Sequence, residues 1–121
     1  MNEGQLLITA YRMLSEHFRR EGSLDLDSLH RTLRSMAEEK SAFPPRRAAA
    51  MLTSIVLNNP FGTLSPAVAM LRALLELDDT GWEWRSSPAE LARKLHTLRD
   101  SGNAEDFIKW FEQRCQKKGS K

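Results

Sequence analysis

The chain has 121 residues, of which 40% are hydrophobic and 28% are charged, and its formal net charge is only +2. A chain of this length and composition forms one globular domain with its own core, which excludes an intrinsically disordered or low-complexity protein. The single cysteine, Cys115, excludes an internal disulfide framework and a cysteine cluster for a metal, and it is typical of a reducing compartment.

The N-terminal sequence and the length of the apolar runs bear on location. Residues 1–18 contain Glu3, no basic segment and no small-residue cleavage motif, so they do not read as a secretory signal. No apolar run reaches the roughly 18 to 20 residues that a membrane-spanning helix needs. We therefore expect a cytoplasmic protein that does not enter a membrane.

Helical periodicity dominates the first half of the chain. Residues 5–21 repeat apolar side chains at helical spacing, and Gly22 follows at the place where a helix C-cap favours glycine. Residues 25–40 form a second helical pattern, which ends before Pro44 because proline disfavours helix at the preceding residue. Residues 45–58 form a third and begin with proline, which is favoured at the first helical position.

Three further helices are expected in the second half. Residues 65–77 begin with a Ser-Pro pair and continue as an apolar run. Ser87 and Glu90 have the spacing of a capping box, ahead of a leucine stripe that ends at "DSGN". The last helix opens at Asn103 and carries the aromatic residues of the C-terminal region.

These patterns predict an all-α fold, a single compact irregular bundle of five or six short helices that forms one domain over residues 1–121. The stretch "EWR" alternates as a strand would, but it is too short to count as one. Residues 113–121 contain several bases and no acid, and we expect them to form a basic, frayed C-terminal tail.

Two neighbouring helices are apolar on nearly every side. In "AAAMLTSIVL" only Thr53 and Ser54 are polar, and in "AVAMLRALLEL" only Arg72 and Glu76. A helix of this kind must be covered all round, but the other helices offer one apolar face each. Either both helices are central and wrapped by the rest, or part of the pair faces outward towards a protein partner or a second copy. For the second case the candidate interface is Leu52, Ile55, Val56, Met70 and Leu74.

Trp82 and Trp84 lie one residue apart in "TGWEWRSSPAE", between two helices. In an extended segment both indoles point to the same side. They then either close over one end of the core, against Trp110 or Phe111, or form a stacking platform for nucleic-acid bases beside Arg85.

The sequence offers little chemistry. The three histidines are dispersed, and no His-Glu-x-x-His, Cys-x-x-Cys or glycine-rich phosphate motif is present. Asp78 and Asp79 follow a helix, where adjacent acids are typical of a solvated turn. We therefore assign no catalytic residue, no metal ligand, no cofactor and no small-molecule substrate.

The basic residues are unevenly distributed, since residues 40–75 and 113–121 contain no acid. Binding to a nucleic-acid backbone requires several bases on one face. The candidate contacts are Arg46, Arg47, Arg93, Arg99, Lys117 and Lys118. Alternatively, these bases pair with acids on neighbouring helix faces. No helix-turn-helix reader is apparent, so we expect backbone contact, to RNA or to DNA, rather than sequence-specific reading.

Together these features predict a non-catalytic helical subunit or adaptor of a larger assembly, which docks through its apolar central helix pair. A nucleoprotein complex is one such host, in which the Arg and Lys rows would hold phosphate. In size and helical character the chain is similar to small helical subunits of CRISPR effector complexes, a similarity of class that no motif carries. The alternatives are a free-standing nucleic-acid-binding regulator and a protein–protein interaction module with no nucleic-acid role.

Overall fold

The computed structural model describes residues 2–19 and 22–119. These residues form six α-helices, one 3-10 helix and two three-residue strands, which confirms the expected all-α bundle. In chain order the elements are α1 (Glu3–Phe18), α2 (Leu26–Glu38), α3 (Pro44–Asn58), η1 (Gly62–Leu64), α4 (Ser65–Asp79), β1 (Trp82–Trp84), α5 (Pro88–Ser101), α6 (Ala104–Gln113) and β2 (Cys115–Lys117).

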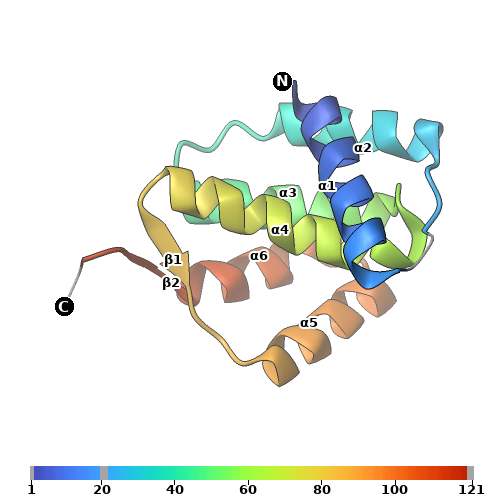
Figure 1. The fold of residues 1–121 in the computed structure, drawn as a ribbon. Coiled ribbons are helices and arrows are strands. Elements are labelled where there is room, and N and C mark those ends of the chain that lie inside the picture. The colour runs from blue at the N-terminus through green and yellow to red at the C-terminus, as the bar shows by residue number, and fades with distance from the viewer. Residues whose placement is uncertain (1, 20–21, 120–121) are drawn as a thin grey trace.

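The helices are arranged in three layers (Figure 1). α3 and α4 pack closely against each other and form the middle layer. α2 packs on α3 and α1 packs on α4 from one side, while α6 and α5 pack on α3 from the other. α3 is therefore covered from both sides and is the central helix of the domain.

The helix ends follow the expected capping chemistry in part. α1 ends at Phe18, and its C-cap is Arg19, which has a φ of 52°, so the expectation that Gly22 caps this helix was wrong. The Ser87 hydroxyl accepts a hydrogen bond from the Glu90 N–H at 3.1 Å, as the capping-box spacing predicts. The Glu90 carboxylate does not close the box. It accepts a 2.6 Å hydrogen bond from the Ser86 hydroxyl and two more from Arg114. At the other end of α5, Gly102 adopts a φ of 68°, the left-handed conformation that favours glycine at a helix C-cap.

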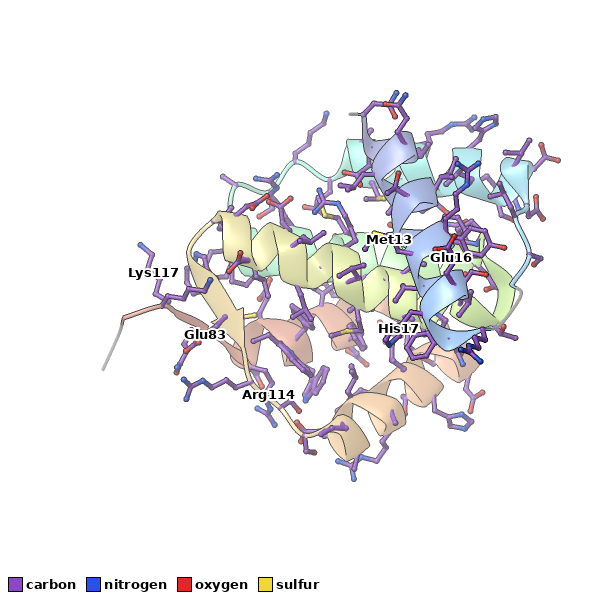
Figure 2. All side chains as sticks on the ribbon, viewed as in Figure 1. Met13, Glu16, His17, Glu83, Arg114 and Lys117 are labelled. Carbon is purple, nitrogen blue, oxygen red and sulfur yellow. The ribbon has the colours of Figure 1, made fainter. Side chains whose placement is uncertain are left out.

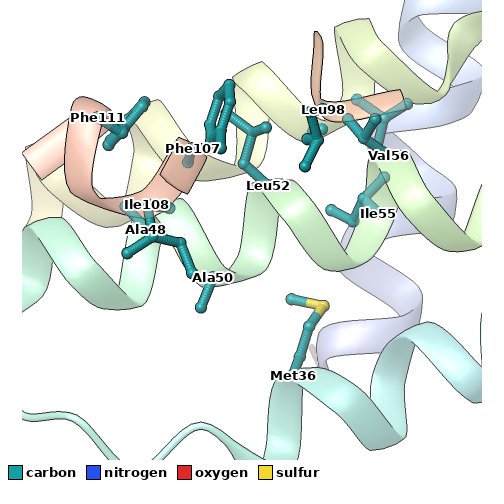
Figure 3. Close-up of a cluster of buried hydrophobic side chains, with 14 of the residues drawn as sticks. Met36, Ala48, Ala50, Leu52, Ile55, Val56, Leu98, Phe107, Ile108 and Phe111 are labelled. Atoms are coloured by element: carbon teal, nitrogen blue, oxygen red, sulfur yellow. The ribbon is translucent and has the colours of Figure 1, made fainter. Parts of the chain in front are cut away.

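The core is built around α3. Figure 3 shows Leu52 and Val56 of this helix facing Leu98 of α5 and Phe107 of α6, with Met36 of α2 beyond the opposite side of α3. All five side chains are buried. A helix that is apolar nearly all round is thus covered nearly all round, as its sequence requires.

The two polar residues in the middle of α3 are buried and satisfied. The Thr53 hydroxyl donates to the Ala50 carbonyl at 3.0 Å, and the Ser54 hydroxyl pairs with the Ser35 hydroxyl at 2.9 Å. Both polar groups therefore enter the core without an unpaired hydroxyl, which would be unfavourable in an apolar interior.

The C-terminal region differs from the frayed tail that we expected. Cys115–Lys117 pairs antiparallel with Trp82–Trp84, and this strand β2 follows α6 after a single residue, Arg114. The pairing continues where the Lys118 N–H donates to the Gly81 carbonyl at 3.0 Å. The expectation was wrong for these residues because the short "EWR" region supplies backbone partners. Residues 120–121 lie outside the described part of the chain.

Candidate interaction surface

One side of α4 is left uncovered by the layered arrangement. α4 packs against α3, α1 and β1, whereas α5 and α6 pack mainly against α3. Leu71, Leu74, Leu75 and Asp78 recur at spacings of three, four and seven residues, so they share one face of the helix. Leu74 is 41% exposed and Leu75 is 38% exposed. The middle and C-terminal part of α4 therefore presents leucines to solvent.

The opposite side of α4 is held in place by a charged cluster. Arg72 donates to the Glu3 carboxylate of α1 at 2.7 and 3.0 Å, and to Glu76 at 3.3 Å. The Glu3 carboxylate raises the pKa of the Arg72 guanidinium above its ordinary value. Glu76 also lies 3.5 Å from Arg47, so its buried carboxylate has two basic neighbours. These contacts fix α1 against α4 and fix which side of α4 faces outward.

α1 extends the uncovered region. Met13 is 60% exposed, and His17 follows one helical turn later on the same side of α1. In Figure 2, Met13 and His17 are labelled on the edge of α1 that lies towards α4, and Glu16 is labelled on the other edge. We call the surface formed by Met13, Leu71, Leu74 and Leu75 the α4 face.

Of the five residues that the sequence proposed as a partner interface, three are buried in the core and two reach the surface at least in part. Leu52 and Ile55 are fully buried and Val56 is 5% exposed, all within the core around α3. A partner could reach these three only by opening the domain, so in this fold they are core residues. Met70 is half-buried, and Leu74 is exposed on the α4 face.

Arg46 is surrounded by acids. Its guanidinium donates to both oxygens of Glu105 at 3.1 and 3.0 Å, and it lies 3.8 Å from Glu112 and 3.9 Å from Glu39. The Glu105 carboxylate raises the pKa of Arg46, and Arg46 in turn lowers that of Glu105. A phosphate group would have to displace three carboxylates to reach this arginine.

Three of the other five proposed phosphate contacts are also paired with acids. Arg47 pairs with Glu76 of α4, and Lys118 pairs with Asp78. On α5, Arg93 lies 4.0 Å from Glu90. The remaining two, Arg99 and Lys117, make no ion pair with any residue of 2–19 or 22–119 and lie on different elements. Four of the six proposed bases therefore have an acid within ion-pair distance.

The two strand tryptophans contact other aromatic rings. Trp84 stacks on Phe111 with ring centroids 5.7 Å apart and meets Trp110 edge-on at 6.2 Å. Trp82 meets Phe43 edge-on at 5.3 Å. Both indoles are half-buried, and the contacts of Trp84 match the interpretation that it closes one end of the core. The stacked contact with Phe111 occupies one face of the Trp84 ring, so a stacked base could not use that face.

Sequence reasoning missed the cluster around Glu90. Arg114 donates to this carboxylate at 2.9 and 3.2 Å, and with the Ser86 hydroxyl it lowers the pKa of Glu90 to about 2. The nearby Trp110 indole N–H also helps to lower the pKa of Glu90. It is buried and forms no hydrogen bond of normal geometry with the described residues. A carboxylate with this pKa is a poor general base, so the cluster ties elements together rather than activating Ser86.

Two open pockets on the surface of the described residues are lined by few reactive side chains. One open pocket of about 420 Å³ includes Leu33, Met36 and Met51 and is mostly apolar. Another, of about 460 Å³, includes Thr63 and Arg99. Neither places a nucleophile beside a general base. Within the described ranges, no three histidine, cysteine or acidic side chains are grouped to hold a metal ion.

Across the part of the chain that the structure describes, no helix has both the length and the apolar character that crossing a membrane requires. Comparison with protein-family models, with curated proteins and with solved structures gives no match to this chain.

Proposed function

We propose that the chain is a non-catalytic helical subunit or adaptor that works in the cytoplasm and docks onto protein through the α4 face. The α4 face replaces the central helix pair as the docking surface, because α3 is enclosed and α4 is not. A larger assembly supplies the cover that the domain itself does not provide for α4.

The observation that carries the proposal is the grouping of exposed leucines on a fixed helix. Leu74 and Leu75 lie in the C-terminal half of α4, and Leu71 is half-buried one turn before them. The Arg72 cluster holds this helix in one orientation. Single exposed apolar residues are ordinary on protein surfaces, whereas contiguous ones on a rigid element are typical of interaction sites.

Contact with nucleic acid is the second part of the proposal, and fewer residues support it. Arg99 and Lys117, which make no ion pair with described residues, remain available for phosphate, and Arg93 is only loosely paired. Two or three phosphate contacts give a shallow dependence of affinity on salt. A protein–protein module, within a nucleoprotein complex or outside one, therefore fits the charges better than a free-standing nucleic-acid binder.

Affinity purification from the native host tests the proposal. We expect the tagged chain to retain protein partners after nuclease treatment and to lose them when Leu74→Glu is introduced. Leu57→Glu is the matched control, because Leu57 is also 41% exposed but lies on α3. Equal retention by the Leu74→Glu and wild-type chains would remove the α4 face from the proposal, and loss of all partners to nuclease would favour the nucleic-acid alternative.

A further inference from the structure

We infer that the α4 face is the two-fold interface of a homodimer, in which the α4 helices of two copies pack antiparallel. This inference rests on the proposed function, which identifies the α4 face as a docking surface, and it adds the identity of the occupant as a second copy of this chain. The argument depends on the order of charged and apolar groups along the face.

One end of the α4 face carries a base without an ion-pair partner among the described residues. α1 packs against α4 and η1, and Tyr11 stacks on Phe61 with ring centroids 5.0 Å apart. The C-terminal end of α1 therefore lies beside the N-terminal end of α4, as Figure 1 shows. His17 and Arg19 are exposed at this end of α1, and neither forms an ion pair with a described residue.

The other end of the α4 face carries an acid without an ion-pair partner in the described part of the chain. Asp78 and Asp79 are the last two residues of α4, and both are exposed. Asp78 pairs with Lys118, whereas Asp79 forms no ion pair within the described ranges. The leucines lie between the two charged ends. At a rise of 1.5 Å per residue, Leu71 precedes Asp79 by about 12 Å along the helix axis.

Within residues 2–19 and 22–119, the unpaired Arg19 at one end, the leucines in the middle and the unpaired Asp79 at the other end make the surface self-complementary under a two-fold rotation. In a two-fold dimer the same patch is used by both copies, so every contact occurs twice. Antiparallel packing places Asp79 of each copy towards His17 and Arg19 of the other, and places leucine against leucine. Parallel packing would bring like charges together at both ends, and it would also align the two helix dipoles unfavourably.

Sedimentation equilibrium of the full chain tests the inference. We expect wild type to dimerise and Leu74→Glu to weaken the dimer dissociation constant by at least tenfold, while Leu57→Glu leaves it within about twofold. Circular dichroism and thermal melting of each variant show whether it is folded. A wild-type chain that stays monomeric at high micromolar concentration would overturn the inference, as would a dimer that is indifferent to Leu74→Glu.

Charge reversal tests the antiparallel arrangement. Asp79→Lys should weaken the dimer, and so should the combined His17→Glu and Arg19→Glu variant. Joining all three changes should restore at least part of the lost affinity, because opposite charges again meet across the two-fold axis. If the effects of the separate changes simply add, these ends do not meet and the antiparallel arrangement is wrong.

The outcomes of the two proposals are separable. A monomeric wild-type chain whose host partners are still lost on Leu74→Glu would overturn the homodimer and leave the proposed docking function standing. A dimer that Leu74→Glu dissociates, with no host protein lost in the purification, would leave the homodimer standing and remove docking to a different protein.

Discussion

The Glu90 carboxylate accepts two hydrogen bonds from the Arg114 guanidinium, at 2.9 and 3.2 Å. This pair joins the first turn of α5 to the residue between α6 and β2. Leu98, near the C-terminal end of α5, is fully buried, whereas Leu91, near the N-terminal end, is only half-buried against the core. The ion pair therefore fixes that end of α5 over the aromatic cluster of α6.

The Glu90–Arg114 pair makes stability depend on acid pH. The folded protein lowers the pKa of Glu90 from 4.5 to about 2, chiefly through the hydrogen bonds from Arg114. A carboxyl group whose pKa is lower in the folded state stabilises the fold at any pH above its unfolded-state pKa. This contribution is lost as the pH falls through the folded-state pKa. We therefore expect the urea concentration at the midpoint of unfolding to decrease as the pH is lowered from about 4.5 to about 2.

Glu90→Gln isolates this effect from the other carboxylates. The variant should be less stable than wild type at pH 7, and the difference should shrink towards pH 2 because wild type then loses the same charge. A difference that stays constant over this range would show that Glu90 does not titrate with the depressed pKa.

A second prediction separates core from surface among the leucines of the two central helices. Leu52→Ala should lower the free energy of unfolding by about 2 to 5 kcal/mol, because it leaves a cavity beneath α5 and α6. Leu74→Ala should change it by less than about 1 kcal/mol in the isolated monomer, because much of the side chain is already in water. Urea unfolding at low protein concentration measures both. An equal decrease in the free energy of unfolding for both variants would contradict the assignment of Leu52 to the core and Leu74 to the surface.

A third prediction concerns phosphate contact. Arg46→Ala should change the affinity for a fluorescent oligonucleotide by less than about twofold, because Glu105, Glu112 and Glu39 already neutralise this guanidinium. Arg99→Ala is the comparison, since Arg99 has no described ion-pair partner. Titration at two salt concentrations measures the effect. A large, salt-dependent loss from Arg46→Ala would show that nucleic acid displaces the carboxylates.

A fourth prediction concerns Cys115. Burial, with a smaller contribution from Glu112, raises the pKa of its thiol to about 12. At pH 8 on the order of one thiol in ten thousand would then be ionised, so alkylation of the native protein should be slow. Iodoacetamide labelling followed by mass spectrometry should show fast modification only in denaturant. Rapid labelling of the folded chain would mean that the β1–β2 pair opens readily.

Much of the fold was predictable because it is encoded locally. The Ser87 cap, the proline at the start of α3 and the glycine after α5 each act through their own backbone, and their effects follow from residue type and position. The apolar spacing then indicated which segments are helices. The all-α bundle follows from these signals without knowledge of how the helices pack.

The candidate site was less predictable because it depends on which elements meet. Leu52 and Leu74 belong to equally apolar stretches, and only the packing of α5 and α6 on α3 buries one and leaves the other exposed. The sequence suggested Arg46 as a phosphate contact because its ion-pair partner, Glu105, lies 59 residues away in the chain and is not evident from the local sequence. The strand formed by Cys115–Lys117 likewise depends on a partner more than 30 residues earlier in the chain, which no local pattern reveals.

Site-specific photo-crosslinking in the native host is the most direct test of the α4 face as a docking surface. A benzophenone amino acid would replace Leu74 in one variant and Leu57, its match in exposure, in the other. The account predicts a discrete protein adduct from position 74, either with a second copy or with another protein, and none from position 57. No adduct from position 74, or the same adducts from both positions, would contradict it.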